Sequence, residues 1–122
     1  MGKGIVRNVL RDKRPYKVYT ALLTQTETNP PTAIVLENTI GDIVWTRDDI
    51  GIYRGTLINA FILNKTSIFH SLNNDGNLDF SMQSYIDNQD SIIVITGNTN
   101  MGSTLSDDIL YIQSPIEIRV YN

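Results

Sequence analysis

Short runs of β-branched and aromatic residues, separated by clusters of turn-forming residues, fill the chain from Tyr16 onward. This pattern constrains the fold most, because such runs favour strands and no segment has the apolar spacing of a long helix. The sequence therefore predicts an all-β fold, a single antiparallel β-sandwich or jelly-roll-like barrel formed by residues 16–122. About eight strands are expected, at residues 16–25, 32–38, 43–47, 52–57, 66–72, 78–86, 91–96 and 115–122.

Alternation of apolar and polar residues within these runs predicts which side chains form the core. Residues 59–65 are ambiguous and are interpreted as a loop that turns Phe61 and Ile62 inward. Leu78 is placed on the core face of the run at 78–86. The residues expected to be largely buried are Val18, Leu22, Val35, Ile43, Trp45, Phe80, Met82, Ile93, Val94, Ile116, Ile118 and Val120.

One stretch, SIIVITGNTNMGST at residues 91–104, has nearly the spacing of a phosphate-binding loop. In such a loop a strand leads into G-x-x-x-x-G-K-[ST] and then into a helix. Here Ser103 replaces the lysine, so no charge would reach the phosphates. The segment between Thr104 and Pro115, about ten residues, is too short for a stable isolated helix. The sequence predicts a loop between strands at residues 97–104, and we expect no nucleotide and no cofactor.

The side chains that usually carry catalysis or bind metals are scarce. There is no cysteine, so zinc–thiolate sites and cysteine nucleophiles are excluded. His70 is the only histidine and cannot build a site of several imidazoles. Alternation places it beside Ile68 and Leu72, in the core or at its rim. We therefore predict no metal site, no catalytic residues and a protein that is not an enzyme.

Acidic residues are interpreted as parts of turns. Adjacent aspartates at 48–49 and at 107–108 would point to opposite faces of an extended chain, so neither pair forms an acid–base couple by itself. The loop at residues 73–79 has oxygen-bearing side chains at alternate positions, as calcium loops do. It carries Ser84 where such a loop ends in glutamate, so a hairpin turn rich in Asn and Asp is favoured.

A basic N-terminal arm, residues 1–15, precedes an acidic body. Six of the ten basic residues lie in the first seventeen positions against one acid, and the rest of the chain carries four basic and twelve acidic residues. The arm is a frayed tail, a segment that docks on an acidic protein surface, or a nucleic-acid arm. Nucleic acid is disfavoured because no aromatic residue precedes Tyr16. As an extended or short helical segment, the arm would dock through Lys3, Ile5, Val6, Arg7, Val9, Leu10, Arg11, Lys13 and Arg14.

Four segments of the body resemble a known family: YKVYTALLTQ at 16–25, VLENTIGDIVWTR at 35–47, GIYRGTL at 51–57 and PIEIRVYN at 115–122. They are similar to small, β-rich, virion-associated structural proteins of tailed bacteriophages. The resemblance implies a non-enzymatic protein of the phage particle, either an accessory (decoration) protein of the capsid or a head–tail vertex component. It supplies no catalytic residues. The chain departs from the family pattern by the fifteen residues before Tyr16.

The resemblance also implies a location and partners. Other virion proteins, of the capsid or tail, would be the partners, and a homo-oligomer is expected because exposed edge strands need to be paired or covered. No apolar run has the length of a signal peptide or a membrane span. We expect synthesis in the host cytoplasm and incorporation into the virion, with no membrane and no small-molecule substrate.

The alternative function is a β-sandwich module of a phage fibre that binds a carbohydrate or a host receptor. Such modules use exposed aromatic side chains, and Trp45, Tyr53, Tyr85 and Tyr111 are available. Trp45, in the run IVWTR, fits a core position of a sandwich better.

Overall fold

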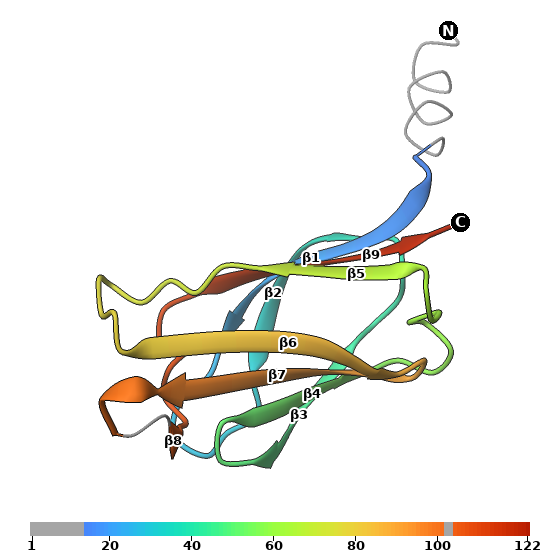
Figure 1. The fold of residues 1–122 in the computed structure, drawn as a ribbon. Helices are drawn as coiled ribbons and strands as arrows, with labels where there is room; N and C mark the ends of the chain where they lie inside the picture. Colours follow the sequence, from blue (N-terminus) through green and yellow to red (C-terminus); the bar gives the residue numbers. More distant parts are fainter. Residues whose placement is uncertain (1–13, 102–103) are drawn as a thin grey trace, which may run out of the picture.

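The computed structural model describes residues 14–101 and 104–122, which form two antiparallel β-sheets packed against each other (Figure 1). The β-sandwich predicted from the sequence is confirmed. One sheet, called sheet A, has the strand order β2-β1-β9-β5. Its strands are β1 (Tyr16–Thr24), β2 (Thr32–Asn38), β5 (Thr66–His70) and β9 (Ser114–Tyr121).

The other sheet, sheet B, has the strand order β3-β4-β7-β6, and the short strand β8 pairs with the end of β7. Neighbouring strands are antiparallel throughout, and the β3–β4 and β6–β7 hairpins have two-residue connections. The elements are β3 (Val44–Asp49), β4 (Ile52–Thr56), β6 (Phe80–Asn88), β7 (Ser91–Asn98), a 3₁₀ turn η1 (Thr99–Met101) and β8 (Thr104–Leu105).

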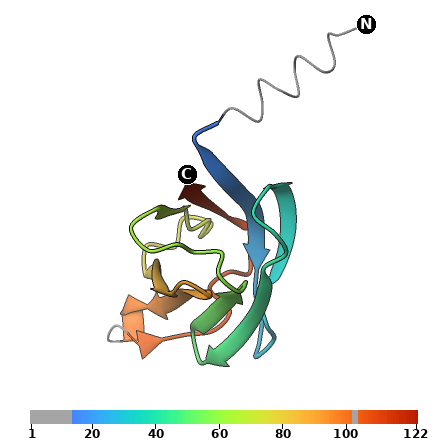
Figure 2. The same ribbon diagram turned by 90° about the vertical axis from the view of Figure 1, so that its right-hand side faces the viewer.

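The strands run between two ends of the sandwich. The terminal end holds the start of β1, the end of β9 and the loop at residues 57–65 (Figure 1, on the side where the C-terminus is marked). The turn end holds the loop at residues 25–31, the β3–β4 turn and the loop at residues 71–79. Figure 2 shows β2 and β3 on the same side of the sandwich, each at the edge of its sheet.

The core lies between the sheets and receives one face of each central strand. Tyr19 and Ala21 of β1 point inward, and strand pairing places them opposite Ile118 and Ile116 of β9. The indole Nε1 of Trp45 donates a hydrogen bond to the Tyr19 hydroxyl at 3.2 Å, so the two sheets are also joined by a polar contact. Other buried side chains of the core are Leu23, Tyr53, Phe61, Ile92, Val94, Ile109 and Leu110.

Most of the predicted core residues are buried or partly buried. The inward-facing positions of the last strand are confirmed, and so is the core position of Trp45. Buried as predicted are Val18, Trp45, Ile93, Val94, Ile116, Ile118 and Val120, while Leu22, Ile43, Phe80 and Met82 are partly buried.

Three core predictions are wrong. Val35 is 48% exposed, because β2 is an edge strand whose inner face is only partly covered by sheet B. Leu78 is 91% exposed, since β6 begins two residues later and leaves it in the preceding loop. The loop at residues 59–65 does turn Phe61 inward, but Ile62 is 48% exposed.

The loop predicted at residues 97–104 is confirmed only in part. Gly97 and Asn98 belong to β7, and Thr104 begins β8. Gly102 and Ser103 lie outside the described residues. Residues 104–113 contain a two-residue strand and turns, so the helix that a phosphate-binding loop requires does not follow.

Candidate functional site

Strand β2 exposes apolar side chains along an edge of the sandwich. It pairs with β1 on one side and, within residues 14–101 and 104–122, with no strand on the other. Ile34, Val35 and Leu36 are 50%, 48% and 61% exposed. Native proteins often blunt such edges with lysine, proline, a β-bulge or a very short strand. β2 has seven residues and no lysine or proline, and its pairing with β1 has one register shift, opposite Thr20 and Ala21. Unpaired backbone groups beside apolar side chains are the features of a protein-contact surface.

A row of arginine and aromatic side chains crosses the outer face of sheet A. The guanidinium carbon of Arg119 lies 4.7 Å from the ring centre of Tyr16 and 5.0 Å from that of Phe69. Its Nε donates a hydrogen bond to Glu117 at 2.6 Å. Hydrogen bonds to Tyr121 and Glu117 raise the pKa of Arg119, which keeps it charged. Arginine and aromatic residues often dominate binding energy at protein interfaces.

A groove of about 360 Å³ lies beside this row. Phe69, half exposed, forms part of it. His70 is at the rim of the core, where its Nδ1 lies 2.8 Å from the Ser84 hydroxyl and its Nε2 lies 3.2 Å from the carbonyl of Met82 on β6. His70 thus joins β5 and β6, the edge strands of the two sheets, on the side opposite β2 and β3. The lining residues are Thr20, Phe69, His70, Ser71, Pro115, Ile116, Glu117 and Arg119.

A buried polar cluster ties together the turn end of the sandwich. The Tyr53 hydroxyl lies 2.7 Å from Oδ1 of Asp107 and 2.7 Å from Oε1 of Gln25. Arg47 donates from Nη2 to Oδ2 of Asp107 at 2.7 Å, and the backbone N–H of Gly51 donates to Oδ1 at 3.0 Å. No buried side-chain nitrogen or oxygen in the described part of the chain lacks a hydrogen-bond partner, so the cluster is satisfied.

The same cluster shifts the pKa of both acids in it. Burial raises the pKa of Tyr53 most, and the hydrogen bond to Asp107 raises it further. Burial also acts to raise the pKa of Asp107, but hydrogen bonds from Arg47, Gly51 and Tyr53 outweigh it, and the pKa is lowered. Near neutral pH, Asp107 is therefore a carboxylate and Tyr53 a neutral phenol, each held by structural partners.

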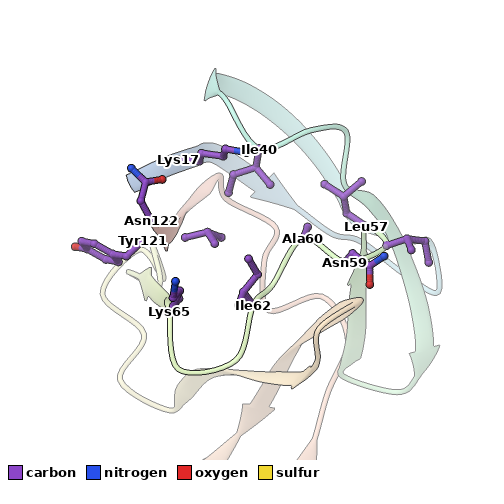
Figure 3. A pocket seen from close by; sticks show the side chains of 11 residues that line it. Lys17, Ile40, Leu57, Asn59, Ala60, Ile62, Lys65, Tyr121 and Asn122 are labelled. Atoms are coloured by element: carbon purple, nitrogen blue, oxygen red, sulfur yellow. The ribbon is translucent and has the colours of Figure 1, made fainter. Parts of the chain in front are cut away.

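A cavity of about 300 Å³ opens at the terminal end of the sandwich (Figure 3). Lys17 reaches it from β1, and Ile62 and Lys65 reach it from the loop between β4 and β5. No acidic residue lines it. The lining residues are Lys17, Ile40, Leu57, Ile58, Asn59, Ala60, Ile62, Lys65, Val120, Tyr121 and Asn122.

The predicted docking arm is described only at its last residue. Arg14 forms an ion pair with Glu37 on β2 at 2.9 Å and lies 5.8 Å from the ring centre of Tyr16. Arg14 thus contacts its own domain. The other predicted docking residues lie outside the described residues: Lys3, Ile5, Val6, Arg7, Val9, Leu10, Arg11 and Lys13.

The acidic loops form the turns that the sequence predicts. Asn74 Oδ1 accepts a hydrogen bond from the Gly76 N–H, and Asn77 Oδ1 accepts one from the Asp79 N–H, so this loop is built from Asx turns. In the β3–β4 turn, Oδ1 of Asp49 accepts the N–H of Ile50.

Two of the four aromatic residues named for a recognition module are exposed. Trp45 and Tyr53 are buried, whereas Tyr85 and Tyr111 are 48% and 43% exposed. The sequence did not single out Phe69 or Arg119, because their contact joins β5 to β9, strands distant in the chain. The alternation of apolar and polar residues in PIEIRVYN does place Arg119 on the outer face, and this was the one sequence feature that pointed to it.

No group of three or more His, Cys, Asp or Glu side chains within residues 14–101 and 104–122 is arranged to hold a metal ion. In the same residues, no helix has the length and apolar character needed to cross a membrane. Comparison with protein-family models, with curated proteins and with solved structures found no match to this chain.

Proposed function

We propose that this chain is a non-enzymatic structural protein of a bacteriophage particle that acts through protein–protein contacts. It would serve as an accessory protein of the capsid or as a component of a head–tail vertex. The observation that carries this proposal is the exposed apolar edge of β2, with Ile34, Val35 and Leu36 about half exposed beside unpaired backbone groups. A strand with these properties invites pairing with another chain.

The outer face of sheet A adds to this surface. Leu22 lies opposite Ile34 across the β1–β2 pair, so apolar side chains continue from the edge onto the sheet. Arg119 and its aromatic neighbours, Tyr16 and Phe69, lie further along the same sheet. Together they offer the apolar, aromatic and arginine side chains that are enriched in protein interfaces. The sequence resemblance to virion proteins is the reason for placing these contacts in a phage particle.

Quantitative mass spectrometry of purified particles of the phage that encodes this chain tests the proposal. We expect a copy number fixed relative to the major capsid protein across preparations. A chain present in infected cells but absent from purified particles would refute the virion role.

Binding of a carbohydrate remains a second candidate, favoured by the groove beside Phe69. This half-exposed ring stands next to Glu117 and Arg119, whose charged groups could bind sugar hydroxyls. A glycan array probed with the wild-type chain and with Phe69→Ala would detect this function. Binding that Phe69→Ala abolishes would support it, and the absence of bound glycans at high protein concentration would exclude the glycans on the array.

A further inference from the structure

The cavity at the terminal end has the chemistry to receive an acidic and apolar group. Ile40, Leu57 and Ile62 contribute apolar walls, while Lys17 and Lys65 contribute two positive charges. Neither lysine forms an ion pair with an acid of the described chain. At about 300 Å³ the cavity lies at the lower limit for ligand pockets. This size suits one or two side chains of a protein partner better than a large ligand.

The β3–β4 turn, at the opposite end of the sandwich, carries a group of this kind. Ile50 is 52% exposed although it is a large apolar residue, and the exposed aspartates Asp48 and Asp49 precede it. Asp48 is paired with Arg54 at 2.9 Å, whereas Asp49 forms no ion pair with another described residue. The turn therefore presents an apolar side chain beside a carboxylate.

The turn is held rigidly, which favours its use as a contact. The Gly51 N–H donates to Asp107 at 3.0 Å, and the Gly51 carbonyl accepts from Thr96 at 2.8 Å. Gly51 has a φ of 65°, and a Cβ there would lie 2.5 Å from the Thr96 carbonyl oxygen, so only glycine fits. A loop already fixed in its bound shape loses little conformational entropy on binding.

We propose that the β3–β4 turn of one copy inserts Ile50 and Asp49 into the lysine-flanked cavity of a second copy. The cavity is lined by residues just before β3 and just after β4, and the turn joins these two strands at their far ends. The two surfaces thus lie at opposite ends of the sandwich, and the contact is head to tail. Such contacts build rings or filaments rather than closed two-fold dimers. This contact would be one of the protein–protein contacts of the proposed function, and its role in a phage particle rests on that proposal.

Complementary variants of the full chain test the contact. In the turn variant, Asp49→Asn with Ile50→Ser, asparagine keeps an acceptor for the backbone N–H but loses the charge, and the apolar side chain is removed. In the cavity variant, Lys17→Glu with Lys65→Glu, the two positive charges are reversed. The matched control, Asp75→Asn with Leu78→Ser, makes the same chemical changes in another exposed loop, where Leu78 is 91% exposed.

Sedimentation velocity over a range of protein concentrations gives the readout. We expect wild type and control to form oligomers that weaken with salt, and each variant alone to remain monomeric with a melting temperature within a few degrees of wild type. Mixed, the two variants should form a 1:1 complex and nothing larger, because one supplies an intact turn and the other an intact cavity.

Three outcomes would overturn the proposal: wild type that stays monomeric at all concentrations, oligomers that both variants still form, or mixed variants that do not associate. A further variant, Val35→Lys on β2, distinguishes the two contacts. If it abolishes the oligomers while the turn variant and the cavity variant still form them, the copies associate through the sheet edge and the head-to-tail contact is wrong. Particle mass spectrometry decides the virion role separately.

Discussion

Asp107 accepts a hydrogen bond at 3.0 Å from the backbone N–H of Gly51, a residue 56 positions earlier in the chain. Through this contact the segment after β8 fixes the tip of the β3–β4 turn. Arg47 on β3 and Tyr53 on β4 contact the same carboxylate, so both strands of the hairpin are tied to Asp107. The position of the exposed Ile50 therefore depends on a partly buried acid.

Replacing Asp107 by alanine should lower the melting temperature, because Arg47, Gly51 and Tyr53 lose a common partner. Asp79→Ala, in an exposed loop, is the control and should change little. Thermal unfolding followed by circular dichroism measures both variants. Equal melting temperatures for the two would show that the cluster does not stabilise the turn end.

Acid should weaken the fold through the same residue. The folded-state pKa of Asp107 is lowered, so its contribution is present above the unfolded pKa, near 4, and is lost as the pH falls through the lower folded value. Urea unfolding of wild type and Asp107→Asn at pH 7 and at pH 3 measures this. The stability difference between them should shrink at pH 3, and a difference that grows would contradict the assignment.

Alkali should destabilise the chain through Tyr53. Its pKa is raised in the folded state, chiefly by burial, so its contribution is complete below the unfolded pKa, near 10, and is lost as the pH rises above it. Tyr53→Phe cannot ionise and should lose less stability than wild type between pH 9 and pH 11. Parallel losses in the two proteins would show that other groups control alkaline unfolding.

Two aliphatic residues that the sequence placed together in the core should differ in their effects on stability. Ile118→Ala should cost about 2–5 kcal/mol, because Ile118 is fully buried between the sheets. Val35→Ala should cost far less, because Val35 is 48% exposed at the edge. Chemical unfolding measures both. Similar large losses would mean that the inner face of β2 is covered in solution.

Deletion of residues 1–13 should leave the sandwich folded, since β1 begins at Tyr16 and Arg14 retains its ion pair with Glu37. We expect an almost unchanged melting curve and weaker, salt-dependent incorporation into particles, because the arm is rich in basic residues. Failure to fold would place the arm in the core of its own domain. Normal incorporation would make it a tail without a docking role.

Strand positions were predictable because Gly, Pro, Asn and Asp mark most of the turns. The inner face of β1 was not, because its sequence carries apolar residues on both faces. Pairing with β9 places Tyr19, Ala21 and Leu23 on the inner face and Val18 and Leu22 on the outer face, where Val18 is nevertheless buried. Nor could the sequence tell that β2 forms an edge, since that depends on which strands pair.

The contact surfaces were less predictable than the strands. Adjacent aspartates before Ile50 and Gly51 indicated a turn, but nothing local indicated that Asp107 would fix it or that Ile50 would stay exposed. The cavity combines Lys17 with residues from the loop after β4, and its lysines come together only through the fold. Contacts between residues so far apart in the chain depend on the strand order, which cannot be read from the local patterns of one sequence.

We propose above that this chain assembles through protein contacts at the edge of sheet A. Val35→Lys places a charge in the middle of the exposed edge of β2, and Thr46→Lys makes the matched change at an exposed position of the edge strand β3. Copies of each variant per purified particle, counted by mass spectrometry against the major capsid protein, are the most direct measurement. We expect at least a tenfold loss for Val35→Lys, about 1.4 kcal/mol or more in binding free energy, and near-normal incorporation of Thr46→Lys. Equal incorporation of both variants, each folded, would contradict it.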